Sequence, residues 1–441
     1  MTGTSSPLDI STRLQRIAEL ARKVPKLTTL AHHVDIEFLR EAYRRTRKDG
    51  ATGIDGQTAA EYGEHLEENL QSLLDRFKSG SYHAPPVRRV HIPKGDGKTR
   101  PIGIPTFEDK VLQRAVTMVL DAVYEQDFLD CSYGFRPGRS AHGALQALWD
   151  GLMAMHGGWM VEVDIQGFFD ALDHQQLRTF LDGRVCDGVL RRTINKWLKA
   201  GVLEGGEWRR SEGGTPQGGV VSPILANVYL HEVVDKWFDV EVKPRLRGPA
   251  FLVRYADDMV FAFAQETDAR RVLDVLAKRF AKYGLALHPD KTRLVPFGRP
   301  RLGDEAHRAD GSFDFLGFTH VWGQSRRGSW IVKRRTAKGR FGRALRRVGD
   351  WCRRHLHLPV GDQHRHLAQM LRGHYGYFGI TGNADALGRF LYEVRRTWRK
   401  WLDRRTGRSR MPWNRFTRIL DRFPLPPPKV VHSVYPSTAN P

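Results

Sequence analysis

Two adjacent carboxylates, Asp257 and Asp258, stand between two apolar runs and are the residues of this chain best suited to chemistry. The runs, 251–253 and 259–263, are rich in β-branched and aromatic residues, which predicts a hairpin with the acidic pair at its tip. Acidic residues are also common in plain turns, and the pair taken alone is consistent with that interpretation. Buried carboxylates are costly unless a cation neutralises them, and Mg²⁺ favours oxygen ligands and substrate phosphates. The pair is therefore a candidate metal site, provided that the rest of the chain supports it.

A third carboxylate, Asp164, lies near the end of the apolar run 159–165, which predicts a buried strand. If this strand lies beside the predicted hairpin, Asp164 converges with Asp257 and Asp258. Three carboxylates suffice to hold two Mg²⁺ ions, the arrangement that stabilises the attacking and leaving oxygens in phosphoryl transfer. Asp173 is different, because it precedes a helical pattern and N-capping explains it without a catalytic role.

Two loops have a composition that suits contact with phosphates or nucleotides. Residues 213–219 place four glycines around a proline and Gln217, and glycines let the backbone approach a ligand closely. Residues 93–101 carry Lys94 and Arg100 on a predicted hairpin tip, where they would grip a triphosphate. An ordinary surface turn is the simpler explanation of each loop taken alone.

The elements that must position these residues change in character along the chain. Apolar spacing predicts helices over 11–24 and 38–47, and from about 85 to 320 short apolar runs, glycine turns and helices alternate, as in α+β proteins. Residues 336–410 contain 18 Lys and Arg against 5 Asp and Glu, a net charge of +13 out of +22 for the chain. Apolar residues recur there at helical intervals, which predicts helices with an apolar core and a cationic exterior. The Pro-rich tail is predicted to be disordered.

The charge balance of the chain indicates a polyanionic partner. The 441 residues include 71 Lys and Arg against 49 Asp and Glu, and such an excess repels itself unless a polyanion binds. Nucleic acid is the first candidate, and a membrane is disfavoured because no run of about 18 apolar residues exists. A basic run is usually a solvated face, but such faces normally mix both signs, which favours nucleic-acid contact here. Without a visible secretory signal, disulfide framework or cysteine metal pair, we expect a cytoplasmic protein.

Seven motifs follow one another along the chain. They are the basic loop at 93–101, the segment 132–140, the Asp164 strand with Phe168-Phe169-Asp170, the loop 215–219, Tyr255-Ala256-Asp257-Asp258, and the segments 285–292 and 313–318. This order resembles that of a reverse transcriptase, and more closely that of the bacterial group II intron reverse transcriptase/maturase. Residues 371–379 resemble the maturase segment of that family, and the resemblance spans about residues 40–420.

The resemblance implies a right-hand polymerase of the α+β class. Fingers and palm with an antiparallel sheet would be followed by an α-helical thumb that is also the maturase domain. The implied bounds are 1–40 for an N-terminal helical extension, 41–330 for fingers and palm, 331–423 for the thumb and 424–441 for the tail.

The resemblance also implies roles for individual residues. The metal ligands, for Mg²⁺ or alternatively Mn²⁺, are matched by Asp164, Asp257 and Asp258. The site of the incoming deoxynucleoside triphosphate (dNTP) is matched by Lys94, Arg100, Gln217 and Phe169, the last being the aromatic beside the sugar 2′ position. Basic residues that we predict to bind RNA are Arg136, Arg139, Arg346, Arg347, Arg395, Arg396, Arg399 and Lys400.

The implied reaction is attack of a primer 3′-hydroxyl on a dNTP, copying RNA into DNA. The implied partners are an RNA template with a DNA primer, the intron RNA whose splicing the protein assists and a DNA target; a homodimer is compatible with this. Two alternatives stay open: a reverse transcriptase of phage defence or CRISPR spacer acquisition, and an RNA-binding splicing factor without polymerase activity. The maturase-like segment argues against the first, and the intact carboxylates argue against the second.

Many relatives carry a C-terminal nuclease with cysteine pairs. No cysteine follows Cys352 here, and the histidines between 355 and 366 lack cysteine partners. We therefore expect neither metal binding at these histidines nor DNA cleavage by this polypeptide, and the primer would come from another source.

Overall fold

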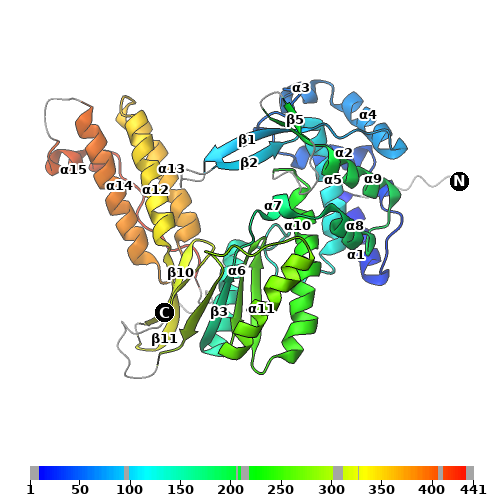
Figure 1. The fold of residues 1–441 in the computed structure, drawn as a ribbon. Coiled ribbons are helices and arrows are strands. Elements are labelled where there is room, and N and C mark those ends of the chain that lie inside the picture. Colours follow the sequence, from blue (N-terminus) through cyan, green and yellow to red (C-terminus); the bar gives the residue numbers. More distant parts are fainter. Residues whose placement is uncertain are drawn as a thin grey trace. The chain divides into compact units, whose positions relative to one another are not determined.

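The computed structural model, drawn in Figure 1, describes residues 9–93, 99–204, 207–209, 218–300, 311–325, 327–405 and 411–433. The chain divides into two compact units. Unit 1 contains Met1–Ala144 and Val163–Arg293, and unit 2 contains Leu145–Glu162 and Leu294–Pro441. The domain bounds expected near 40, 330 and 423 follow changes in sequence character, and they stay predictions. None of the described helices combines the length and the apolar character that crossing a membrane requires.

Unit 1 begins with helices that local sequence signals specify. α1 (Ile10–Lys23) and α2 (Ile36–Arg45) confirm the two helices predicted from apolar spacing. At the start of α2 the Asp35 carboxylate accepts a hydrogen bond from Phe38 N, which satisfies an otherwise unpaired amide. The other elements before the first sheet are η1 (Ala31–His33), α3 (Ala59–Glu64) and α4 (Leu66–Ser79).

The strands on either side of the basic loop pair as a hairpin, as predicted. β1 (Val87–Pro93) and β2 (Thr99–Ile104) pair antiparallel, with Ile92 opposite Arg100. β4 (Val202–Glu204) pairs parallel with β1, and β5 (Glu207–Arg209) pairs with β4, so the sheet order is β2-β1-β4-β5. α5 (Phe107–Tyr124) follows the hairpin and is buried on most sides, because its sequence is apolar nearly all round.

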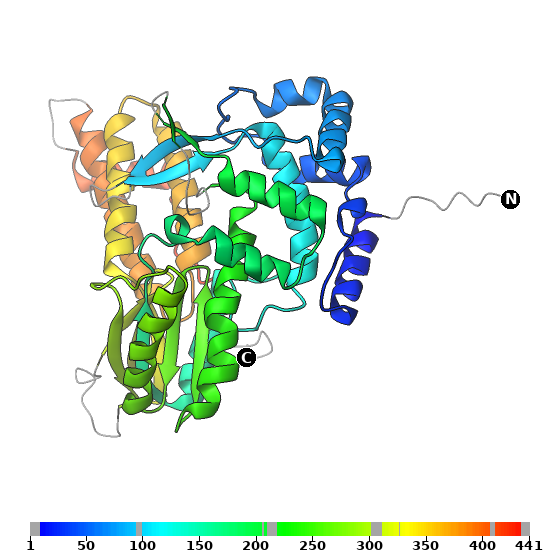
Figure 2. The same ribbon diagram turned by 45° about the vertical axis from the view of Figure 1, so that its right-hand side comes forward.

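The second part of unit 1 builds the acidic hairpin. β6 (Ala250–Tyr255) and β7 (Asp258–Phe263) pair antiparallel with Tyr255 opposite Asp258, which confirms the predicted hairpin. α11 (Glu266–Lys282) packs against β7 (Figure 2). Asp173 caps α8 by accepting a hydrogen bond from Gln176 N at 2.8 Å, which confirms the predicted cap. The helices between the two hairpins include α7 (Phe168–Ala171), α8 (His174–Asp182), α9 (Gly188–Lys199), α10 (Ser222–Leu230), η2 (His231–Asp235), η3 (Trp237–Val242) and η4 (Lys243–Arg245).

Unit 2 combines short strands with long basic helices. Its elements are α6 (Ala141–Met155, most of it in this unit), β3 (Gly157–Val163), β8 (Arg293–Gly298), β9 (Phe313–Phe315), β10 (Phe318–Gln324), β11 (Trp330–Thr336), α12 (Lys338–Arg354), α13 (Val360–Phe378), α14 (Ala384–Arg404) and α15 (Trp413–Arg422). β9, β10 and β11 form an antiparallel sheet with the order β11-β10-β9. β3 and β8 are neighbouring strands of a further sheet.

The core of the helical part of unit 2 centres on Trp398. α12, α13 and α14 lie side by side (Figure 1) and bury this side chain completely. Its Nε1 donates a hydrogen bond to Gln363 Oε1 at 2.9 Å, and Val348, Leu371 and Phe416 belong to the same apolar cluster. Helices with an apolar core and exposed basic residues were predicted for this region, and the structure confirms them.

Residues 424–433 of the tail pack against the helices of unit 2, the unit to which they belong. Leu425 is buried in the helical core, and Tyr375 Oη donates to Pro426 O at 3.3 Å. His432 forms a parallel bridge with Ile380. For these residues the structure differs from the predicted disorder, because Leu425, which stands among the prolines, packs into the apolar core. Residues 434–441 lie outside the described ranges.

Candidate active site

Asp257 and Asp258 lie at the tip of the β6–β7 hairpin. Tyr255 and Asp258 are the closing pair, so Ala256 and Asp257 form a two-residue turn. Ala256 has a φ of +55°, the left-handed conformation that such a hairpin turn requires. The Asp257 side chain is half-buried and that of Asp258 is exposed. Strand pairing on both sides therefore fixes where the two carboxylates leave the sheet.

Gly134 packs directly against this turn. A Cβ atom on Gly134 would lie 2.3 Å from Ala256 N, so only glycine fits there. The neighbouring Ser132 forms a parallel bridge with Arg254 on β6. The 132–140 motif thus supports the acidic turn through close backbone contacts.

Asp164 directly follows β3 and contacts the segment after α11. Its carbonyl accepts a hydrogen bond from His288 N at 2.8 Å, and Ile165 forms an antiparallel bridge with Leu287. Its carboxylate pairs with Lys291, whose Nζ lies 3.2 Å from Oδ2 and 3.3 Å from Oδ1. Lys291 therefore supplies the Asp164 carboxylate with a counter-charge.

Asp257 is sensitive to the charges of three other side chains. Burial raises the pKa of its carboxyl above the ordinary value, and the negative charge of Asp164 also raises it. Arg100 on β2 and Arg254 on β6 act in the opposite direction and lower it. The structure therefore brings Asp164, Asp257 and Arg100 close enough to interact electrostatically.

The oxygen donors suit a hard divalent cation, although they do not form a ready ligand cage. Within the ranges that the structure describes, no group of three or more His, Cys, Asp or Glu side chains is placed to hold a metal ion. Carboxylates repel one another without a cation between them, and Asp164 is bound to Lys291. The three carboxylates are nonetheless oxygen ligands of the kind that Mg²⁺ prefers. Asp164, Asp257 and Asp258 stay our predicted ligands.

The structure describes two of the four predicted nucleotide-binding residues. Arg100 is exposed on β2. Phe169 is half-buried in α7, with its ring centroid 5.3 Å from that of Phe168 in an edge-on arrangement. Lys94 and Gln217 lie outside the described residues.

The basic residues of unit 1 that we predict to bind RNA have internal partners. The Arg136 side chain is 3% exposed and donates to both carboxylate oxygens of Glu125 and to backbone carbonyls. Arg139 pairs with Asp130 at 2.5 Å and lies over the Tyr133 ring. Because the guanidinium of Arg136 is used inside the unit, Arg136 is not part of the RNA-binding surface that we propose. Arg139 stays a prediction.

A groove in unit 2 contains two of the predicted RNA-binding residues. Arg346 of α12 and Lys400 of α14 line a groove of about 400 Å³, and Trp401 and Arg353 line it as well. Cations beside an aromatic ring suit RNA, whose phosphates need positive charge and whose bases stack. Sequence patterns alone predicted the charges but not that they share one groove.

The other predicted residues of unit 2 differ in exposure. Arg347 and Arg396 are exposed, whereas Arg395 and Arg399 are half-buried. Arg399 donates to Met411 O at 2.8 Å and is therefore partly engaged inside the unit.

Sequence reasoning missed Lys291, Arg254 and Asp235. Arg254 is fully buried in β6 and forms an ion pair with Asp235 of η2. The sequence does contain a signal for it, because a charged residue inside an apolar strand needs a buried partner. Lys291 lies within the segment 285–292, which indicates the family by its place among the seven motifs. The type of this residue alone did not predict a role.

Comparison with known proteins gives the family. Residues 92–320 match the family described as reverse transcriptase (RNA-dependent DNA polymerase). The group II intron-encoded protein LtrA of Lactococcus lactis subsp. cremoris is 45% identical over 170 residues, which are 38% of this chain and 28% of LtrA. Protein YkfC of Escherichia coli K12 is 32% identical over 368 residues, which are 75% of this chain and 89% of YkfC. The mitochondrial nuclear intron maturase 2 of Arabidopsis thaliana is 28% identical over 175 residues, 31% of this chain and 24% of that protein.

The matched region contains the whole candidate site of unit 1. The chain spans less than a third of LtrA but most of YkfC. The match to the family covers the basic loop at 93–101, Asp164, Phe169 and the acidic turn. The chain therefore belongs to the reverse transcriptase (RNA-dependent DNA polymerase) family.

Proposed function

We propose that this protein is an RNA-directed DNA polymerase encoded by a group II intron, which adds dNTPs to a primer on an RNA template. The observation that carries the proposal is the position of Asp257, at the tip of an antiparallel hairpin and within reach of the charges of Asp164 and Arg100. In this proposal residues 41–330 form fingers and palm, and the basic helices of 331–423 form the thumb and maturase domain.

Nucleotide transfer depends on alignment and charge neutralisation more than on covalent catalysis. Asp164, Asp257 and Asp258 would hold Mg²⁺, which supplies positive charge at the reacting phosphate when bound. Arg100, exposed on its hairpin, contacts the triphosphate. Phe169 contacts the sugar at its 2′ position and excludes ribonucleotides by its bulk. The primer 3′-hydroxyl then attacks the α-phosphorus, and pyrophosphate leaves.

The basic helices of unit 2 would bind RNA. The template is one such RNA, and the intron RNA whose splicing the protein assists is another, with a DNA target for retromobility. The names of LtrA and of the plant intron maturase support this assignment. The three cysteines are free thiols, which suits a reducing cytoplasm. The DNA that flanks the reading frame should encode group II intron RNA domains, and their absence would contradict the intron assignment.

Primer extension on an RNA template tests the polymerase. The wild-type protein should make cDNA that depends on Mg²⁺, and Asp257→Asn should abolish extension, because it removes a ligand charge while keeping the side-chain size. Asp274→Asn, an exposed position on α11, is the matched control and should extend normally. RNA binding should be unchanged in both variants.

Each component of the proposal can fail separately in this experiment. Extension at the wild-type level by Asp257→Asn would contradict the metal assignment. A wild-type protein that binds RNA but extends no primer would contradict the polymerase assignment and favour a splicing factor.

A further inference from the structure

Arg254, the third residue before Asp257, has all of its hydrogen-bond donors satisfied. The guanidinium has five N–H groups, and each has an acceptor within 3.0 Å. Nε donates to Asp235 Oδ1 at 2.8 Å, and Nη2 donates to Asp235 Oδ2 at 2.5 Å. The other acceptors are Asn227 Oδ1, Ser132 Oγ and Ala256 O. Arg254 and Asp235 are both completely buried.

The acceptors come from separate segments of unit 1, and one of them belongs to the acidic turn. Asp235 belongs to η2, Asn227 to α10, and Ser132 to the segment that runs beside β6. The fourth acceptor is the carbonyl of Ala256, which Nη1 reaches at 3.0 Å. We refer to Arg254, Asp235, Asn227 and Ser132 as the turn brace.

The turn brace also holds the segment that packs against the turn. Asn227 Nδ2 donates to the carbonyl of Gly134 at 2.7 Å, and Tyr133 N donates to Arg254 O at 2.8 Å. Gly134 is the residue whose missing side chain lets it touch Ala256. Two sides of the left-handed Ala256 are therefore fixed, one by Gly134 and one by the guanidinium of Arg254.

Stability alone does not account for this arrangement. A buried ion pair is often no more stabilising than well-packed apolar residues, because both charges lose their hydration. The planar fork of arginine, by contrast, fixes several acceptors at defined angles, which a lysine cannot do.

We propose that Arg254 and Asp235 are positioning residues of the polymerase site: Arg254 holds the Ala256 carbonyl, Asp235 holds the Arg254 guanidinium, and together they direct Asp257 and Asp258 toward the metal. The inference rests on the proposed polymerase function. It adds that the geometry of the acidic turn is set by a buried arginine that touches neither metal nor substrate. Loss of the brace should therefore weaken metal binding and slow nucleotide addition, while leaving dNTP binding nearly unchanged.

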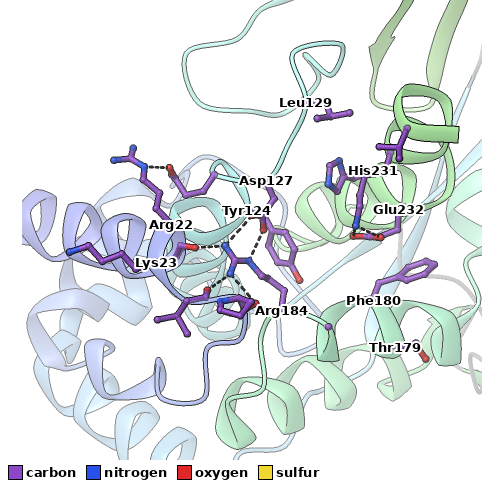
Figure 3. Close-up of a pocket in the computed structure, with 17 residues that line it drawn as sticks. Arg22, Lys23, Tyr124, Asp127, Leu129, Thr179, Phe180, Arg184, His231 and Glu232 are labelled. Atoms are coloured by element: carbon purple, nitrogen blue, oxygen red, sulfur yellow. Dashed lines mark hydrogen bonds and ion pairs between the residues drawn. The ribbon is translucent and has the colours of Figure 1, made fainter. Parts of the chain in front are cut away.

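Arg184 provides a matched control in the same unit. It too is bidentate on an aspartate, donating from Nε and Nη2 to Asp127, and it donates to carbonyls at the end of α1, among them that of Ala21 (Figure 3). These contacts border a pocket of about 840 Å³ and include no residue of the acidic turn. An Arg-to-Lys change at 184 should therefore disturb folding in a similar way without affecting the metal site.

The test compares Arg254→Lys with Arg184→Lys in the full-length protein. For Arg254→Lys the Mg²⁺ concentration for half-maximal extension should rise about 10-fold, because partners behind metal ligands typically have effects of that size. kcat should fall, and KM for dNTP should stay close to the wild-type value. Arg184→Lys should lower the melting temperature and leave the Mg²⁺ dependence unchanged.

A second measurement does not depend on polymerase activity. Tb³⁺ takes oxygen ligands like Mg²⁺, and its luminescence, excited through tyrosine, reports binding near Tyr255. Arg254→Lys should weaken Tb³⁺ binding about 10-fold, as partners behind the ligands do, and Asp257→Asn should weaken it further. If wild type makes no cDNA, this assay still tests the brace apart from the polymerase proposal.

The proposal would be overturned if Arg254→Lys had the same Mg²⁺ requirement and the same Tb³⁺ affinity as wild type. It would also be overturned if Arg254→Lys and Arg184→Lys changed the Mg²⁺ requirement equally. If Arg254→Lys does not fold, Ser132→Ala decides, since it removes one acceptor and keeps the ion pair. It should raise the Mg²⁺ requirement in the same direction by a smaller factor. An unchanged requirement would then overturn the proposal.

Discussion

The acidic turn of unit 1 and the basic helices of unit 2 both carry charge suited to a nucleic acid, but they hold it in different ways. Around the turn, Arg254 and Asp235 are fully buried, and every guanidinium donor has an acceptor. On α12 and α14, Arg346 and Lys400 are exposed along a groove. Reacting atoms need fixed geometry, since a displacement of about 1 Å can cost about 100-fold in rate. Phosphate contacts instead add charge by charge. A single substitution should therefore cause a large loss of activity around the turn. On the basic helices each substitution should cause only a small loss of RNA affinity.

Together with Asp257→Asn, Asp164→Asn is expected to have the largest effect. Removing one of the predicted ligand charges should slow nucleotide addition by about 1,000-fold, because metal-ion stabilisation of the transition state is worth several kcal/mol. Single-turnover addition at saturating dNTP measures this directly. Asp290→Asn, an exposed acid close to Lys291, is the control and should stay within a few-fold of wild type. A rate near wild type for Asp164→Asn would mean that Asp164 only forms an ion pair with Lys291. Asp164 would then no longer be a predicted metal ligand of the acidic turn region.

Neutralising a cluster of charges on α14 should have the next largest effect. Arg395, Arg396, Arg399 and Lys400 changed together to glutamine should weaken RNA binding by about 100-fold at physiological salt and lower the salt slope by up to about 3. Because Arg399 already donates to Met411 O, we expect the change in slope to fall short of that limit. Filter binding from low to high salt checks both quantities. An unchanged slope would show that α14 does not contact phosphates.

The features of the fold that the sequence predicted are those that local patterns decide. The β6–β7 hairpin follows from two apolar runs around an acidic turn, and the α8 cap follows from Asp173 before a helical pattern. The helices of unit 2 follow from apolar spacing around residues such as Trp398. In each case the signal lies within a few neighbouring residues or in the regular spacing of apolar residues along one helix.

The features that the sequence did not predict depend on partners far away in the chain. Lys291 lies 127 residues from Asp164, and Arg254 lies 122 residues from Ser132. Charge alone suggested RNA contact for Arg136, but the fold gives it Glu125 and backbone carbonyls instead. Only the tertiary structure shows which charges pair inside the protein and which stay exposed. This is the difference between the acidic turn and the basic helices.

A change at the nucleotide site should have an intermediate effect. Phe169→Ala should reduce the preference for deoxynucleotides over ribonucleotides by roughly 30-fold, since steric exclusion by a single group is worth about that much. The ratio of kcat/KM for a dNTP and for the matching ribonucleotide measures it. Phe169→Tyr keeps the ring and should keep the preference. An unchanged ratio in Phe169→Ala would remove Phe169 from the nucleotide site without touching the assignment of the metal ligands.

The smallest effect is expected for a single arginine of the groove, and it separates the two regions most clearly. Arg346→Gln should lower the salt slope by about 0.7, the value for one contact with a single strand, and weaken RNA binding only a few-fold. The melting temperature should not change, because the side chain is exposed on α12. Arg346→Lys keeps the charge and should restore wild-type binding, whereas Arg254→Lys keeps the charge and should still fail. If Arg346→Lys binds RNA as weakly as Arg346→Gln, the groove recognises RNA through the geometry of the guanidinium. In that case the charge-by-charge description of the basic helices is wrong.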